Sequence, residues 1–136
     1  MVILIVSRRE AFWNALTPQF TRRSLIVKIC GSLDSAIEII HANAPALVIL
    51  DNCAENTDDS VQLRQAHVRT TRDALTAVVM ANAVVHTAVV TFLDAEAFHD
   101  AMEGFGVLCS LPLEPGPDDI DGLAGALVEV RAVGAV

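Results

Sequence analysis

The sequence predicts an α/β domain, a doubly wound sheet of five parallel strands, (βα)5, with helices on both faces. Three observations predict this class. Short apolar runs without polar alternation recur along the chain, and such runs are typical of strands buried on both faces. Segments with helical apolar periodicity lie between them. The central run, Ala46–Asp51, is unbroken and ends on a carboxylate, at the strand end where open parallel sheets hold their ligands.

Length and composition predict one cytoplasmic domain, residues 1–136. The net charge of −8 argues against a nucleic-acid surface, because phosphate contacts need clustered Lys and Arg. Cys30, Cys53 and Cys109 form no CxxC pair, which favours reduced thiols over a disulfide framework or a zinc site. No apolar stretch has the length of a membrane span and no signal peptide is recognisable, so no membrane contact is expected.

The first fifty residues predict three strands and two helices. The strands are expected at Val2–Val6, Leu25–Cys30 and Ala46–Asp51. Ser7 and Glu10 have the spacing of a capping box, which predicts a first helix over about residues 8–20. Trp13 lies beside the apolar stripe of this helix and is interpreted as partial core.

Short polar residues predict where two other helices begin. Ser32 or Asp34 is expected to cap the second helix, which Pro45 stops. Asp94 is expected to cap a later helix that Gly104 ends. Both helices directly follow predicted strands, as a βα alternation requires.

The position of the fourth strand depends on two near-copies of one tetrapeptide, Thr76–Val79 and Thr87–Val90. The second copy is preferred, because the residues around it are dense in β-branched and aromatic side chains. Residues 72–85 would then extend the preceding helix or form an extra one. The first copy would instead require a long helix over about residues 83–103. Either way, an insertion is expected around residues 72–86.

No enzyme or metal motif accompanies this layout. The sequence contains no Gly-rich phosphate loop, dinucleotide fingerprint or nucleophile elbow, so enzyme activity is not expected. The four histidines have no ligand spacing with one another or with a cysteine, so no metal site is expected. They are His41, His67, His86 and His99.

The layout resembles the receiver domain of bacterial two-component response regulators, the CheY-like domain with a flavodoxin-like sheet. The resemblance rests on Val2–Ala15, Leu33–Asp51, and Asp94–Pro112 with the closing helix that starts at Asp118. It implies a cytoplasmic signalling protein with protein partners. In that family the aspartate at the position of Asp51 accepts a phosphoryl group from a histidine kinase.

Most of the residues that this family uses around its aspartate are replaced here. Ser7 and Arg8 stand where the resemblance implies two Mg²⁺-binding carboxylates, and an arginine would repel a divalent cation. Leu111 stands where it implies a phosphate-binding lysine, before Pro112. The resemblance also implies a cis Leu111–Pro112 bond, which only X–Pro pairs tolerate cheaply. Conventional phosphorylation is therefore expected to be lost, and no cofactor is expected.

Two further positions follow from the resemblance. The hydroxyl residue at the end of the fourth strand is Thr91 in the preferred register, whereas the other register puts Ala81 there. Arg8 has two readings: it projects toward Asp51 and replaces the metal with a fixed ion pair, or it is a solvated arginine in the first helical turn.

The loop after Asp51 offers two weaker candidates. Glu55, Asp58 and Asp59 are interpreted as solvated helix-start carboxylates, and the alternative is a displaced cation site. Cys53 is interpreted as an ordinary free cysteine, and the alternative is a reactive thiol.

The leading hypothesis is a receiver-like regulatory domain, a pseudo-receiver, that acts through protein–protein interaction, as a homodimer or with another protein. One alternative is a working phospho-acceptor at Asp51 that binds Mg²⁺; another is a domain that binds a small ligand. The resemblance implies docking by the surface of the fourth helix, fifth strand and fifth helix. The apolar candidates on or near it, most of them expected to belong to the core, are Phe98, Met102, Leu111, Leu113 and Leu123. The apolar insertion between Leu75 and Val85 is a second candidate interface.

Overall fold

The computed structural model describes residues 1–51 and 61–134 and confirms the predicted fold class. The strands are β1 (Val2–Ser7), β2 (Ile26–Cys30), β3 (Leu47–Asp51), β4 (His86–Val90) and β5 (Cys109–Leu111). The helices are α1 (Glu10–Thr21), α2 (Leu33–Ala42), α3 (Val61–Ala81), α4 (Ala95–Ala101) and α5 (Pro117–Gly134). The strands form one parallel sheet in the order β2-β1-β3-β4-β5.

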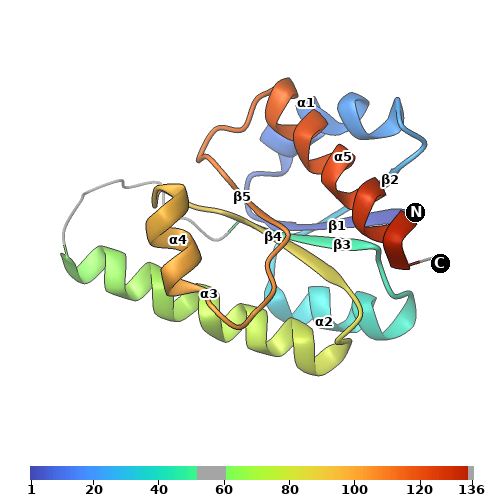
Figure 1. The fold of residues 1–136 in the computed structure, drawn as a ribbon. Coiled ribbons are helices and arrows are strands. Elements are labelled where there is room, and N and C mark those ends of the chain that lie inside the picture. The colour runs from blue at the N-terminus through green and yellow to red at the C-terminus, as the bar shows by residue number, and fades with distance from the viewer. Residues whose placement is uncertain (52–60, 135–136) are drawn as a thin grey trace.

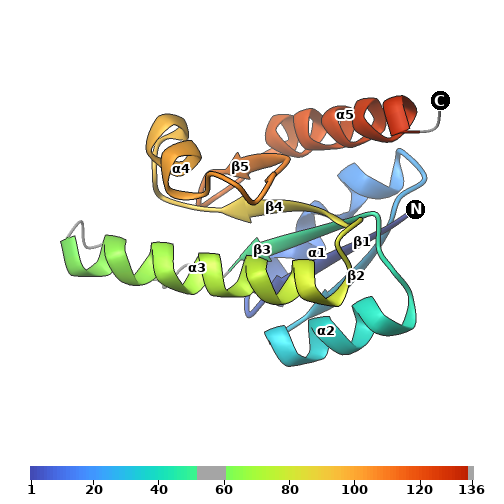
Figure 2. The same ribbon diagram turned by 60° about the horizontal axis from the view of Figure 1, so that its bottom comes forward.

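Helices cover both faces of the sheet (Figures 1 and 2). α1 and α5 pack on one face, and α2, α3 and α4 pack on the other. Helices are needed on both faces because the side chains of the central strand β3 alternate between two apolar cores. Leu47 and Ile49 belong to the core beneath α1 and α5, whereas Val48 and Leu50 belong to the core beneath α2, α3 and α4. All five β3 residues are buried, as its unbroken apolar run predicts.

The start of α1 differs from the capping-box prediction. The helix begins at Glu10 rather than residue 8, and its N-cap is Arg9. Ser7 cannot serve as the cap, because it is still part of β1 and pairs in register with Asp51. Its Oγ accepts from the backbone N–H of Arg9 at 2.9 Å, two residues on, instead of three.

The two other predicted caps are confirmed. Ser32 Oγ accepts from the backbone N–H of Ser35 at the start of α2, at 3.2 Å. Asp94 Oδ1 accepts from the backbone N–H of Ala97 at the start of α4, at 2.8 Å. α4 ends at Ala101, and the turn that follows contains Gly104 with φ of +94°, a conformation that glycine adopts without strain.

The fourth strand uses the second tetrapeptide copy, as preferred. β4 pairs with β3 from Leu47 opposite His86 to Leu50 opposite Val89. The first copy, Thr76–Val79, lies inside α3, so residues 72–81 continue the preceding helix. The β-branched residues remain helical there because the helix buries one apolar face, which includes Val78, and such packing outweighs the local strand preference.

The sequence predicts the last strand over Val107–Pro112, but β5 is shorter and spans only Cys109–Leu111. The Leu111–Pro112 peptide bond is trans, so the cis bond implied by the resemblance is wrong. Trans remains the favoured isomer even before proline. α5 then buries Ile120, Leu123 and Leu127 against the sheet, as its spacing predicts.

The structure also tests the predictions about cysteines, metal sites and membrane spans within the described residues. Cys30 and Cys109 are free and half-buried, and burial raises the pKa of both thiols. In residues 1–51 and 61–134, no three His, Cys, Asp or Glu side chains are grouped to hold a metal, and no helix is long and apolar enough to cross a membrane. The predictions for four loop residues lie outside the described residues. These are Cys53, Glu55, Asp58 and Asp59.

Candidate functional site

The candidate site lies at the carboxyl edge of the sheet, around Asp51. This residue ends β3 and pairs in register with Ser7, the last residue of β1. Thr91 directly follows β4, and Leu111 ends β5. The parallel sheet therefore brings together the strand ends from which the predicted site residues come.

Three side chains donate to a single oxygen of Asp51. Ser7 Oγ donates to Oδ2 at 2.8 Å, and the indole Nε1 of Trp13 donates to the same atom at 2.8 Å. Arg9 Nε donates to it at 2.9 Å, and Arg9 Nη2 lies 2.8 Å away. Only 2% of the Asp51 side chain is exposed. The buried carboxylate is thus compensated by one full positive charge and two neutral donors, as a buried charge requires.

Arg9 is held in place by its neighbours as well as by Asp51. Its guanidinium carbon lies 4.3 Å from the centroid of the Phe12 ring, a cation–π contact. Its backbone N–H donates to Ser7 Oγ, the hydroxyl that itself donates to Asp51. The Arg9 side chain is 31% exposed, so the pair is only partly screened by water. The cation at this carboxylate is therefore a fixed part of the chain.

Arg9, not Arg8, makes the ion pair with Asp51. Arg8 is exposed, which agrees with its reading as a solvated arginine. The backbone N–H of Arg9, the N-cap of α1, donates to Ser7 Oγ, and this contact keeps Arg9 beside Ser7 and Asp51. Trp13, interpreted as partial core, is fully buried and also a site residue. It follows Arg9 by four residues, the spacing that brings two side chains to one helix face.

The hydroxyl of Thr91 is hydrogen-bonded to His67, a residue for which the sequence predicts no role at this site. His67 Nε2, on α3, lies 2.8 Å from Thr91 Oγ1, and both side chains are buried. The Thr91 hydroxyl also accepts from the backbone N–H of Leu93 at 3.1 Å. The His67 ring packs against Phe92, with 4.8 Å between centroids. Burial lowers the pKa of His67, which favours the neutral ring.

The position expected for a cation on the last strand is apolar. Leu111 is buried, and it lines a cavity of about 480 Å³ together with Thr91, Pro112 and Leu113. The described residues that line this cavity include no Lys or Arg. Arg9 is therefore the positive charge that the structure brings to the site residues.

Four of the five interface candidates belong to the core, as expected for most of them, and Leu111 is one of the four. Phe98, Met102 and Leu123 are buried beneath their own helices, so their apolar spacing reflects packing against the sheet. Leu113 is partly exposed and remains available at the surface. Of the five candidates, Leu113 is thus the one that contributes apolar surface near α4, β5 and α5.

Comparison with known proteins identifies the fold. No family model matches the chain, and no curated protein matches it in sequence. The chain is similar in structure to a two-component response regulator from Clostridium difficile, with a TM-score of 0.70, 12% identity, and coverage of 95% of this chain and 96% of that one.

Two receiver domains give similar values. A CheY-like response regulator receiver domain from Methanospirillum hungatei JF-1 has a TM-score of 0.71 and 14% identity, covering 96% of both chains. The signal receiver domain of a putative Luxo repressor protein from Vibrio parahaemolyticus has a TM-score of 0.72 and 14% identity, covering 98% of this chain and 95% of that one. The chain has the fold of the CheY-like receiver domains of response regulators.

Proposed function

We propose that this chain is a receiver-like regulatory module that acts by binding protein partners and does not use conventional Mg²⁺-dependent phosphorylation of Asp51. The observation that carries the proposal is the ion pair between Arg9 and Asp51. A receiver fold supports a role in signalling, and this ion pair argues against the usual chemistry of such a domain.

Phosphoryl transfer to Asp51 needs a carboxylate oxygen as the nucleophile and cations that neutralise the phosphoryl oxygens. Oδ2 of Asp51 already accepts from three side chains, and its water-exposed surface is small. A divalent cation about 4 Å from the Arg9 guanidinium would be repelled by roughly 8 kcal/mol at an effective dielectric constant of about 20. Mg²⁺ binding beside Asp51 therefore requires Arg9 to leave.

Two other positions support the same proposal. Leu111 has no charge to offer a phosphoryl group, and burial makes it part of the core. The Thr91 hydroxyl is engaged by His67 and by the backbone of Leu93, so it is satisfied without a phosphoryl oxygen. The metal, the lysine and the hydroxyl that the resemblance implies are thus replaced or occupied. No catalytic activity is proposed for the chain.

The test is the intact mass of the protein after incubation with acetyl phosphate and Mg²⁺. The wild type is expected to gain no phosphoryl group, as is the Asp51→Asn variant. A gain by the wild type that Asp51→Asn abolishes would refute the proposal and favour the phospho-acceptor alternative. A small-ligand alternative predicts a raised melting temperature in a metabolite screen, because a ligand specific to the native state stabilises it.

A further inference from the structure

A groove of about 450 Å³ runs between α3 and α4, away from Asp51. Both helices pack on the same core of the sheet, and Figure 1 shows α4 next to the N-terminal half of α3. Three arginines of α3, Arg64, Arg69 and Arg72, line the groove together with apolar residues of both helices. The proposed function uses none of these residues.

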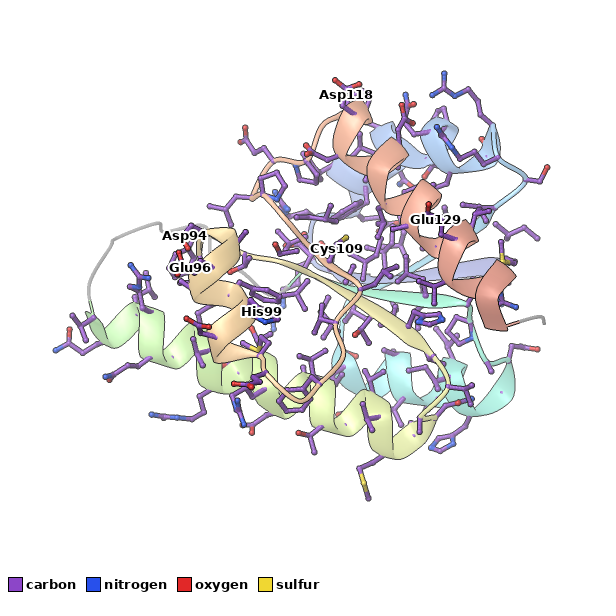
Figure 3. The ribbon with its side chains drawn as sticks, viewed as in Figure 1. Asp94, Glu96, His99, Cys109, Asp118 and Glu129 are labelled. Carbon is purple, nitrogen blue, oxygen red and sulfur yellow. The ribbon has the colours of Figure 1, made fainter. Side chains whose placement is uncertain are left out.

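The charged side chains that line the groove all come from α3 and are basic, whereas the protein as a whole is acidic. The chain has 9 basic and 17 acidic residues, yet three arginines and no Asp or Glu are among the described residues that line the groove. The exposed acidic residues Asp94 and Glu96 lie at α4, next to the groove, but are not among the described residues that line it (Figure 3). A positive patch on an acidic protein attracts acidic ligands and steers their approach.

The floor of the groove is apolar, and small side chains of α4 form one of its walls. Val68 is half-buried and Leu93 is 9% exposed. Ala97 and Ala101, four residues apart on α4, let a bound segment approach this helix closely. Apolar surface beside the basic side chains of α3 fits a segment that carries both apolar and acidic side chains.

Arg72 is already fixed in the groove wall. Its Nη1 donates to the backbone carbonyl of Ala101 at 2.8 Å, across to α4. Its guanidinium carbon lies 5.1 Å from the centroid of the Phe105 ring. A preordered arginine loses less conformational entropy when a carboxylate binds to it, so binding here costs less than at a mobile side chain.

We propose that the α3–α4 groove binds an acidic amphipathic segment of a partner protein. This inference rests on the proposed function, since it names the surface and the partner chemistry of that interaction. A nucleic acid fits less well, because the net charge of −8 repels phosphates over the rest of the surface. A second copy fits less well for the same reason, since two chains of equal negative charge repel each other.

The test measures binding of a fluorescent peptide of about 16 residues, composed of Glu and Leu at helical spacing, to the full chain. Fluorescence anisotropy gives the affinity, and backbone amide NMR shifts locate the binding surface. A peptide with Gln in place of Glu is the matched ligand control. The expected amide shifts lie in residues 64–72 and 93–101. The variant is Arg64→Glu/Arg69→Glu, and its charge-matched control is Arg8→Glu/Arg131→Glu, at two exposed positions outside the groove.

The groove variant is expected to weaken peptide binding about tenfold or more, whereas the control variant weakens it less than about twofold. Failure of the Glu/Leu peptide to bind, equal binding of the Gln peptide, or equal loss in both variants would overturn the inference. Binding of an oligothymidylate with the same arginine dependence, without peptide binding, would assign the groove to nucleic acid instead. Dimers in sedimentation that the groove variant dissociates would assign it to a second copy.

The two proposals fail separately in these experiments. The peptide is measured without Mg²⁺ or acetyl phosphate, so phosphorylation of Asp51 does not enter the binding assay. Phosphoryl uptake in the mass experiment would refute the proposed function while leaving peptide binding to the groove intact. Absence of peptide binding together with an unchanged mass would overturn only the groove inference.

Discussion

Replacement of Arg9 by methionine tests the central contact of the site. Met keeps an unbranched apolar side chain over Phe12 but removes the positive charge from Asp51. Removal of one partner of a fully buried ion pair typically costs about 3–5 kcal/mol, because the other charge is left uncompensated. Here Arg9 is 31% exposed, and Ser7 and Trp13 still donate to the carboxylate. We therefore expect a smaller loss, about 2 kcal/mol of the free energy of unfolding, the range of a charged hydrogen bond.

Urea unfolding followed by tryptophan fluorescence measures this loss. Trp13 is the single tryptophan of the chain, and it is fully buried with its indole N–H on Asp51. For a domain of this size, a loss of about 2 kcal/mol corresponds to a fall in melting temperature of roughly 6–10 °C. An unchanged m-value would show that stability, rather than the compactness of the unfolded state, has changed.

Arg8 provides the matched control. Arg8→Met removes the same charge one residue earlier, from an exposed side chain, and should change stability by less than about 0.5 kcal/mol. A double-mutant cycle of Arg9→Met with Asp51→Asn should give a coupling energy of about 1–2 kcal/mol. Equal losses for the two methionine variants, or no coupling between Arg9 and Asp51, would refute the ion pair as the stabilising contact.

Trp13→Phe keeps an aromatic ring but removes the donor to Asp51 and part of the buried ring volume, so thermal unfolding followed by circular dichroism should show a loss of more than about 1–2 kcal/mol. Burial lowers the pKa of His67 below its ordinary 6.5, so the unfolded chain binds more protons than the native one just below pH 6.5. Stability contributed by neutral His67 is thus complete above pH 6.5 and declines as the pH falls toward the native pKa. His67→Gln should flatten this pH dependence in urea titrations, and the exposed-site variant His99→Gln should not. Met80→Lys should change the melting temperature little, because Met80 is 82% exposed on α3.

The sheet and its helices were predictable because each strand carries a strong local signal. β3 is buried on both faces, and its continuous apolar run has no alternative reading as a half-exposed strand. Ser32 and Asp94 cap their helices through contacts only three residues long, which the sequence alone encodes. At the tetrapeptide Thr76–Val79, by contrast, the local sequence signal does not determine the structure. Its strand-like composition is overruled by the core contacts of Leu75 and Val78, which belong to one helix face.

The site was only partly predictable, because its contacts depend on the geometry between elements. Asp51 was identified from the end of its strand and Ser7 from the resemblance to receiver domains, but the choice between Arg8 and Arg9 depends on how the chain leaves β1. His67 lies 24 residues before Thr91 in the sequence, and no local pattern links the two. Their contact exists because α3 crosses beside the end of β4. Side-chain pairs of this kind require the packed structure.

The replacement of an exchangeable metal by Arg9 has a consequence for regulation under the proposed function. A bound Mg²⁺ leaves when its concentration falls, whereas an arginine of the same chain stays at a high effective concentration beside Asp51. The ion pair is reinforced from two sides, by the Phe12 ring and by the Ser7 hydroxyl, so Arg9 does not reorient without losing several contacts at once. A ligand can shift a conformational equilibrium only by its differential affinity for the two states. Under this proposal, the carboxyl edge of the sheet is held in one state, and the input to the domain is the concentration of the partner that binds it.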